Sequence, residues 1–464
     1  MAYLALDVAQ WAAENFGTCE LGDARRARRA VKLAQQMAEH PDGSTPDQTE
    51  RWADLKAAYR LAHCDDVTFT AVADPHWRQT RAKGAGRVLL IGDTTETDFG
   101  IERQIEGLGP TGNNGGRGFF LHSSLMVVPG TREIIGLAGQ ELFYRQPKPK
   151  GETDDQARHR EQRESQVWGR VIDRVGAPAD GVQYVHVFDR GADNIEVFCH
   201  AAQQRSDWVI RASSLHRTVV EETADGPLEP ASLRAVLDRQ PSLGTYELDV
   251  RATKDQPARR ARLKVRAVRV TIPCPRKGRT KYIQDIGFES LTQWVVEARE
   301  VDPPAGAQAI CWVLWTSLPV TSFDDAWQVL EYYECRWVIE EFHKAIKTGC
   351  RLESRQYATA HSLEALAAFT CVLAVRLVQL KTIAQSAPHT PAEHVIPKAW
   401  LQMLRALRKA PILTVRDFYR HLAGLGGFLM RKGDGEPGWI TIWRGTHKLL
   451  LALRGHDAMK KKCG

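Results

Sequence analysis

The sequence lacks the cysteine pattern of a disulfide-bonded or zinc-binding protein. Its nine cysteines are scattered along 464 residues, and no two of them form a Cys-x2-Cys pair. An odd and scattered set argues against a disulfide framework, and the missing pairs argue against structural zinc. We therefore expect reduced thiols, as in a bacterial cytoplasm.

Targeting and low-complexity segments are missing as well. The opening residues show no basic region followed by an apolar core, which is the pattern of a signal peptide. The most apolar run, 363–380, is interrupted by Glu364 and Arg376, which favours a buried helix over a membrane span. The composition, 43% hydrophobic and 26% charged, is globular, and the length suits about three domains. We expect a cytoplasmic, nucleoid-associated protein with no membrane partner.

An overall excess of charge is also absent, because the net charge of +7 is modest for this length. The cations are instead concentrated between Lys254 and Lys281, where eleven Lys or Arg accompany one acid. Basic and apolar residues alternate there, which predicts a strand with one cationic face. Such a face is a solvated sheet surface or a nucleic-acid contact, and the scarcity of acids favours the second. The candidate DNA contacts on it are Arg262, Lys264 and Arg266.

Strand and helix patterns predict an α/β fold with a mixed sheet. The apolar runs that predict its strands are 88–91, 119–128, 133–144, 182–188 and 208–212. Residues from about 215 to 310 predict an all-β insertion. We therefore expect a helical DNA-binding domain at 1–85, a catalytic domain at 86–375 and a helical domain at 376–464.

A basic helix is predicted near the N-terminus. Asp23, after Leu21 and Gly22, is a typical N-cap. At helical spacing Arg25, Arg28 and Lys32 share one face, opposite an apolar face. This pattern is compatible with a DNA-binding helix and equally with a plain helical bundle.

The most informative segment is 333–347. As a helix, it places Tyr333, Arg336, Glu340 and Lys347 within an arc of roughly 60°, opposite an apolar face. A carboxylate can bind a divalent metal, and Arg and Lys beside it can bind the phosphates on which that metal acts. The segment therefore predicts a phosphoryl-transfer site on one helix.

Two aspartates complete the predicted metal site. Asp93 and Asp189 each end a predicted strand, so they can converge beside the helix that carries Glu340. Hard oxygen ligands suit Mg²⁺, with Mn²⁺ as a substitute. Two such ions can activate the attacking oxygen and stabilise the leaving one.

Four nearby polar residues receive no ligand role. Asp98 and Asp193 are not counted as ligands, and Asp193 is expected to cap the following helix. His122 and His343 are candidate general bases, but metal-activated water makes a histidine base unnecessary.

The Tyr-x2-Arg-x3-Glu-x6-Lys spacing from Tyr333 to Lys347 resembles the signature of one bacterial family of insertion-sequence, cut-and-paste transposases. Residues 52–60 resemble the N-terminal end-binding domain of that family, and 425–443 resemble its C-terminal dimerisation region. The resemblance covers almost the whole chain. It implies a ribonuclease-H-like core with an Asp-Asp-Glu site, a homodimer, and double-stranded DNA (transposon ends and target) as partner.

The resemblance also implies roles for single residues. Asp93, Asp189 and Glu340 would be the catalytic triad and bind the metal. An aromatic ring at Trp312 would receive a flipped base, whereas Trp315 is expected in the core. The residues expected to contact the DNA backbone are Tyr333, Arg336, Lys344, Lys347 and Arg211.

The implied activity is cleavage of both strands at transposon ends, through a hairpin intermediate, followed by joining of the 3′-hydroxyls to target DNA. Two alternatives remain: a structure-selective nuclease without strand transfer, and a catalytically silent DNA-binding inhibitor. The intact triad and the N-terminal region argue against the inhibitor.

Overall fold

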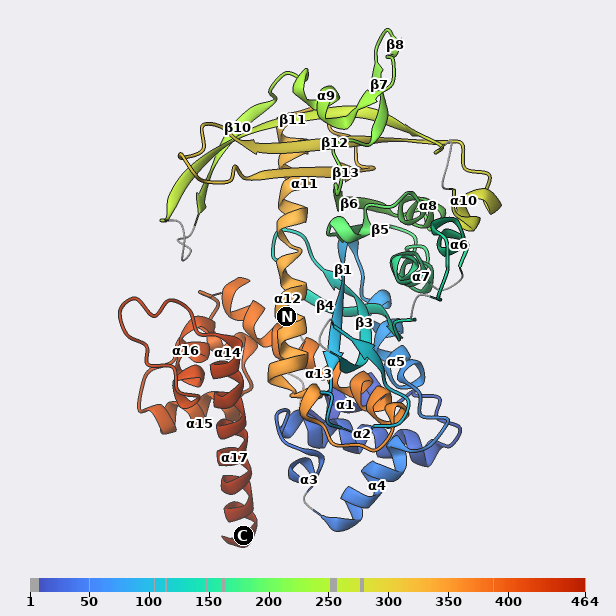
Figure 1. Ribbon diagram of the computed structural model, residues 1–464. Coiled ribbons are helices and arrows are strands. Elements are labelled where there is room, and N and C mark those ends of the chain that lie inside the picture. The colour runs from blue at the N-terminus through green and yellow to red at the C-terminus, as the bar shows by residue number, and fades with distance from the viewer. Residues whose placement is uncertain are drawn as a thin grey trace.

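The computed structural model describes residues 8–49, 51–103, 105–112, 115–146, 149–160, 163–250, 257–275, 279–386 and 388–463. A sheet with helices packed against it forms the middle and top of the molecule in Figure 1, and helical N-terminal and C-terminal regions lie below. A column formed by α11 and α12 runs between the upper sheet and the lower helices. The predicted mixed α/β fold with helical flanking regions is confirmed.

A single mixed sheet of thirteen strands runs through the molecule, in the order β2-β3-β1-β5-β6-β13-β12-β11-β7-β8, while β4, β9 and β10 pair off this path. Its strands are β1 (Gly86–Asp98), β2 (Gly109–Thr111), β3 (Gly116–Val127), β4 (Ile134–Phe143), β5 (Val182–Phe188), β6 (Asp207–Arg211), β7 (Thr218–Thr223), β8 (Gly226–Pro227), β9 (Ala231–Ser232), β10 (Gly244–Val250), β11 (Arg259–Pro273), β12 (Ser290–Glu300) and β13 (Cys311–Thr316).

The catalytic half of the sheet has the ribonuclease-H-like arrangement. Strands β1, β3 and β4 are antiparallel neighbours, and β5 and β6 continue the sheet parallel to β1. Alternate residues of β1 face two cores: Leu89 and Ile91 pack toward the N-terminal helices and α13, whereas Val88 and Leu90 pack toward α7 and α8. This two-sided burial explains why β1 begins with a continuous apolar run.

The insertion is joined to the catalytic half by hydrogen bonds along one strand. β13 pairs with β6 on one side and with β12 on the other, so both halves belong to one sheet. The prediction of an all-β insertion is wrong in one respect, because two short helices, α9 (Leu233–Asp238) and α10 (Lys281–Asp285), lie within it.

The remaining helices cover the sheet or form the terminal regions. They are α1 (Val8–Phe16), α2 (Ala24–Glu39), α3 (Thr45–Gln48), α4 (Trp52–Ala62), α5 (Phe69–Ala82), α6 (Asp154–His159), α7 (Val167–Val175), α8 (Ile195–Gln203), α11 (Phe323–Glu334), α12 (Trp337–Lys344), α13 (Ala360–Ser386), α14 (Ala392–Val395), α15 (Lys398–Arg408), α16 (Val415–Leu425) and α17 (Trp439–Cys463). The stretch Ala360–Gln379 is long and apolar enough to cross a membrane, but 89% of its most apolar window is buried in the protein, as the sequence predicted.

The predicted helix over 333–347 is interrupted. A capping box between Ser322 and Asp325 begins α11, which ends at Glu334. A short turn then leads into α12, and α12 continues into a π-helical turn, Ala345–Gly349. The amide of Cys350 closes this wider turn on the carbonyl of Ala345 at 2.8 Å. Glu340 is therefore on α12 and not on α11, the helix that begins at Phe323.

Eight cysteines have side chains that the structure describes, and all eight are free thiols. Five of them are buried: Cys19, Cys199, Cys335, Cys350 and Cys371.

Candidate active site

Asp93 and Asp189 lie side by side on parallel strands. The pairing of β1 with β5 runs as far as Ile91 opposite Val187, and two further residues along each strand are Asp93 and Asp189. Asp189 directly follows β5, as predicted. The prediction that Asp93 ends its strand is wrong, because β1 continues to Asp98 by pairing with β3.

The residue before Asp93 allows close packing behind the carboxylate. A Cβ atom on Gly92 would lie 2.4 Å from the ring of Phe188, the last residue of β5. Only a glycine gives this ring the space that it occupies. The backbone amide of Thr94 donates a hydrogen bond of 2.7 Å to Oδ1 of Asp93 and fixes the direction of its carboxylate.

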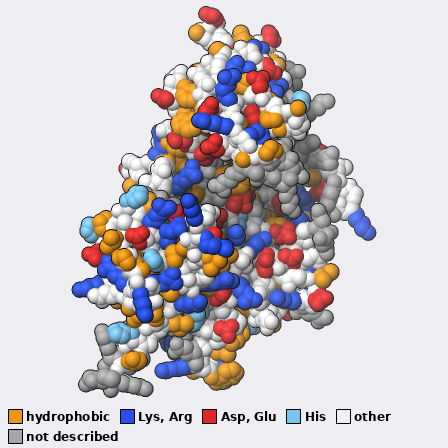
Figure 2. All heavy atoms as spheres, turned by 90° about the vertical axis from the view of Figure 1, so that its left-hand side faces the viewer, with side chains coloured by type: hydrophobic (Ala, Val, Ile, Leu, Met, Phe, Trp, Pro, Cys, Tyr) orange, Lys and Arg blue, Asp and Glu red, His pale blue; other side chains and the backbone are white. Residues whose placement is uncertain are grey.

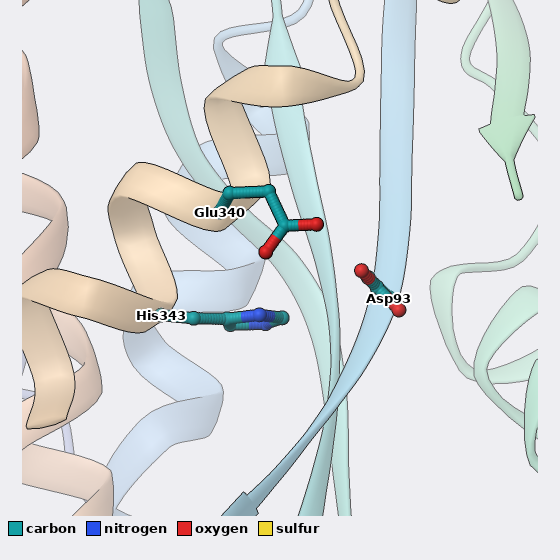
Figure 3. A group of neighbouring side chains, drawn as sticks. All are labelled: Asp93, Glu340 and His343. Carbon is teal, nitrogen blue, oxygen red and sulfur yellow. The ribbon is translucent and has the colours of Figure 1, made fainter. Parts of the chain in front are cut away.

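Glu340 and His343 approach Asp93 from α12. One ligand atom from each of these three residues lies within 4.8 Å of the others. Figure 3 shows both α12 side chains pointing toward the β1 strand, with the imidazole one turn below the carboxylate. Glu340 is exposed, Asp93 is partly buried and His343 is buried.

Arg336 lies between the two carboxylates of Asp93 and Glu340. Its Nη1 atom lies 3.4 Å from Oδ2 of Asp93 and 3.4 Å from Oε1 of Glu340. The pKa of Asp93 is raised to about 6, chiefly by burial and to a smaller extent by the charges of Asp189 and Glu340, while the Thr94 hydrogen bond and Arg336 oppose the rise. Nearby carboxylates favour the protonated form of Asp93 because they repel its negative charge.

These residues fit a divalent cation. The donor set combines carboxylate oxygens with an imidazole whose Nε2 atom is buried without a hydrogen-bond partner. Burial lowers the pKa of His343 to about 3, so its ring is neutral and able to donate a lone pair. The predicted triad is Asp93, Asp189 and Glu340. The structure groups Asp93 and Glu340 with His343 instead, and Asp189 lies next to this group.

Two residues near the site have structural partners. Asp193 does not cap the following helix as predicted: Asn194 caps α8, and Asp193 pairs with Arg217 at 2.8 Å. His122 accepts or donates a hydrogen bond of 2.8 Å with Thr94 and packs edge-on against Trp168. Sequence reasoning gave His343 no ligand role, although its i, i+3 spacing from Glu340 was a signal for one.

The predicted polar face of the 333–347 segment is partly buried. Tyr333 is only 6% exposed and meets the half-buried ring of Trp312 edge-on, with 5.8 Å between ring centroids. Lys344 is exposed, whereas Lys347 lies in the π-helical turn, 3.5 Å from Glu353. The prediction of one continuous face is therefore wrong for Tyr333, while Arg336 and Glu340 do face the same site.

The strand β13 holds both tryptophans of interest. Trp315 is fully buried, in agreement with the predicted core position. Arg211, at the end of β6, donates a 3.3 Å hydrogen bond to the carbonyl of Cys311 on the adjoining strand. Trp312 and Arg211 thus lie on neighbouring strands at the same end of the sheet.

The cationic strand is β11, and acids from neighbouring strands compensate part of its charge. Arg266 pairs with the buried Glu297 of β12 at 3.0 Å, and Arg260 pairs with Glu247 of β10. Arg262 is exposed and Lys264 is partly exposed, and neither side chain forms an ion pair with another described residue. These two side chains are the better placed of the predicted contacts on this strand.

The predicted basic helix near the N-terminus is α2. Asp23 caps it as predicted, and the side chain of Asp23 also pairs with Arg25 at 2.8 Å. Arg28 is exposed, whereas Lys32 pairs with Asp54 of α4 at 2.7 Å.

Figure 2 shows Lys and Arg side chains gathered on the lower half of the face that lies to the left in Figure 1.

The chain matches three protein families along its length. Residues 8–67 match the family described as Transposase DNA-binding. Residues 161–375 match the family described as Transposase DDE domain, and residues 372–461 match the Transposase Tn5 dimerisation domain. The second match contains Asp189 and Glu340 and begins after Asp93, whose place in the site therefore depends on its geometry.

Proposed function

We propose that this protein cuts both strands at transposon ends and joins the freed 3′-hydroxyls to target DNA. The proposal starts from the three matched domains, which make the chain a DNA transposase of the insertion-sequence type. DNA is its partner, and the dimerisation domain provides for a homodimer. Pairing two transposon ends before joining suits a two-fold assembly. The observation that supports the proposal best is the convergence of Asp93 and Glu340 from separate elements.

We assign Asp93, Asp189 and Glu340 to the binding of two divalent cations, with Mg²⁺ as the expected ion. Bound cations would activate the attacking oxygen and offset negative charge on the leaving oxygen. Arg336 would have a second role. If cations bind Asp93 and Glu340, the guanidinium that now contacts these carboxylates could instead bind a phosphate of the scissile strand. Lys344 and Lys347 would hold flanking phosphates.

A hairpin at the transposon end belongs to the same proposal. The first 3′-hydroxyl would attack the opposite strand, which requires a tight bend in the DNA. Trp312, half-buried beside Tyr333, would stack on a base extruded at that bend. We further propose that the protein works in the bacterial cytoplasm, where its thiols stay reduced.

Replacing each triad residue tests the chemistry separately from DNA binding. Asp93→Ala, Asp189→Ala and Glu340→Ala should each abolish cleavage and leave affinity for the ends largely intact, because affinity comes mainly from phosphate contacts. Gel-shift and nicking assays on cognate ends measure the two properties. The exposed Asp155 on α6 provides a control, since Asp155→Ala should change neither. Robust nicking by one triad variant would remove that residue from the site.

A strand-transfer assay separates the alternatives. Joining of precut ends to target DNA is expected of a transposase. A structure-selective nuclease would cut without joining, and a silent inhibitor would bind ends without cutting.

A further inference from the structure

We propose that His343 is itself a ligand of a divalent cation, so that one cation position is a mixed oxygen and nitrogen site. The inference deepens the proposed function and rests on it, because it concerns a cation in the same site. It adds a residue that the Asp-Asp-Glu assignment does not contain, and it changes which metals the site should prefer.

The first observation is distance. Ligand atoms of Asp93, Glu340 and His343 lie within 4.8 Å of one another. Donors that bind one cation at about 2.1 Å and at right angles lie about 3 Å apart. The three side chains would therefore have to close by less than about 2 Å, which small side-chain rotations can provide. Figure 3 shows the imidazole of His343 on the side of α12 that faces Asp93.

The second observation is an unsatisfied nitrogen. His343 is 7% exposed, and its Nε2 atom is buried without a hydrogen-bond partner. Buried polar atoms in proteins are nearly always paired, so an orphan beside two carboxylates calls for an explanation. Coordination of a cation supplies the missing partner.

The helix contributes a third observation. Glu340 and His343 are three residues apart on α12, so both side chains project from the same face. A Glu-x-x-His pair on a helix is an established way to present one oxygen and one nitrogen donor to a metal. The π-helical turn begins only at Ala345, so it leaves this spacing undisturbed.

The ligand set has a consequence for metal preference. All-oxygen sites suit Mg²⁺, whereas imidazole adds affinity for Mn²⁺, Co²⁺ and other transition metals. We therefore expect Mn²⁺ to bind substantially more tightly than Mg²⁺, and the imidazole to provide much of the difference.

Pulsed electron paramagnetic resonance of the full-length protein with Mn²⁺ tests the inference directly, because it detects nitrogen bound to the ion. The wild-type protein should show a ¹⁴N coupling that His343→Gln abolishes. His122→Asn is the matched control: His122 is also buried, lies on β3 beside β1 and is hydrogen-bonded to Thr94, so this variant should keep the coupling. In Mn²⁺ titrations, His343→Gln should weaken binding roughly tenfold or more. Mg²⁺ affinity, measured by competition, should fall far less.

Mn²⁺ binding without nitrogen coupling in the wild-type protein, or coupling that survives His343→Gln, would overturn the ligand role and leave the proposed function standing. Loss of Mn²⁺ binding in Asp93→Asn is expected from the proposed function alone, and its failure to appear would count against that function. If His343→Gln does not fold, as judged by near-ultraviolet circular dichroism, His343→Asn and ¹⁵N-histidine labelling of the wild-type protein give the same answer.

Discussion

Arg336 is the residue that links the two carboxylates of the candidate site. Its guanidinium lies 3.4 Å from both carboxylates and above the exposed ring of Trp337, 5.2 Å from the ring centroid. One positive charge thus contacts both Asp93 and Glu340, the carboxylates that would bind a cation. The guanidinium and the cation compete for the same oxygens, so each must weaken the binding of the other.

Removing this competitor should therefore strengthen metal binding while it impairs the reaction. Arg336→Gln is expected to raise Mn²⁺ affinity of the DNA-free protein several-fold, since a partly exposed ion pair contributes about 1 kcal/mol or less. Cleavage should fall, because a phosphate contact is lost. Calorimetric titration and a nicking assay measure the two effects. Arg132→Gln, which removes an arginine paired with Glu334 on α11, is the control. Equal or weaker Mn²⁺ binding in Arg336→Gln would contradict the competition.

Trp312 offers a second test at the residue scale. Base stacking on an aromatic ring contributes about 1–3 kcal/mol, so Trp312→Ala should slow the hairpin step roughly 5- to 150-fold and spare the first nick. An abasic site at the flipped position should partly restore the rate, because no stacking is then lost. Single-turnover assays with end-labelled DNA resolve the two steps. A variant that loses both steps together, or unfolds, would make the ring a packing element for Tyr333.

Single residues show where sequence reasoning succeeds and where it fails. The position of Asp189 in the site can be predicted from the sequence, because an acid after a buried strand lies at a sheet edge. The ligand role of His343 cannot be predicted in this way, because it depends on Asp93, which β1 brings opposite the helix. Tyr333 was placed on the wrong face because the ring of Trp312, 21 residues earlier in the chain, covers it.

At the scale of the element, β11 shows the same limit. Its alternation was visible in the sequence, but the acids that neutralise it lie on other strands. The pairing register sets Arg266 opposite its ion-pair partner Glu297 of β12, and Glu247 of β10 pairs with Arg260. Such cross-strand partners depend on register, which one segment cannot reveal. The π-helical turn after α12 was likewise invisible to a search for a 3.6-residue period.

The salt dependence of DNA binding tests which cations of β11 face the nucleic acid. Arg262→Gln combined with Lys264→Gln should reduce the slope of log affinity against log salt by about 1.8, since each phosphate contact contributes about 0.9. Arg266→Gln is the contrasting variant, because it disturbs the ion pair with the buried Glu297. It should lower the free energy of unfolding and leave the slope unchanged. An unchanged slope in the double variant would make this strand a solvated surface.

At the scale of the whole molecule, buried histidines connect separate parts of the chain. The amide of Leu137 on β4 donates to Nε2 of His76 at 3.1 Å, so the 2.6 Å contact of Nδ1 with Asn15 on α1 has the ring as donor. Burial lowers the pKa of His76, His122, His186 and His343 to about 3. The folded protein therefore keeps four neutral rings that the unfolded chain would protonate near pH 6.5.

This difference predicts sensitivity to acid. The contribution of the four rings is present above pH 6.5 and is lost as the pH falls, at about 1.4 kcal/mol per ring and pH unit. Asp93 acts oppositely: its raised pKa gives stability at low pH that is lost as the pH rises through about 6. Between pH 7.5 and 5.5, the free energy of unfolding should fall by about 4.5 kcal/mol.

Chemical denaturation at both pH values measures the loss. His186→Leu removes one ring whose two nitrogens are both buried without partners, so it should reduce the loss by about a third. Equal stability of the wild-type protein at pH 7.5 and 5.5 would contradict the assignment of neutral rings.

The continuous sheet offers a site for a reporter label far from the candidate active site. The β7–β8 hairpin lies at the upper end in Figure 1, far from α12, yet it belongs to the sheet that carries Asp93. Gly226, the first residue of β8, directly follows the turn at φ +118°, and a Cβ atom there would meet nothing within 4 Å. A fluorophore attached in this turn, at Asp225, would occupy open space and report the orientation of the catalytic strands without touching them.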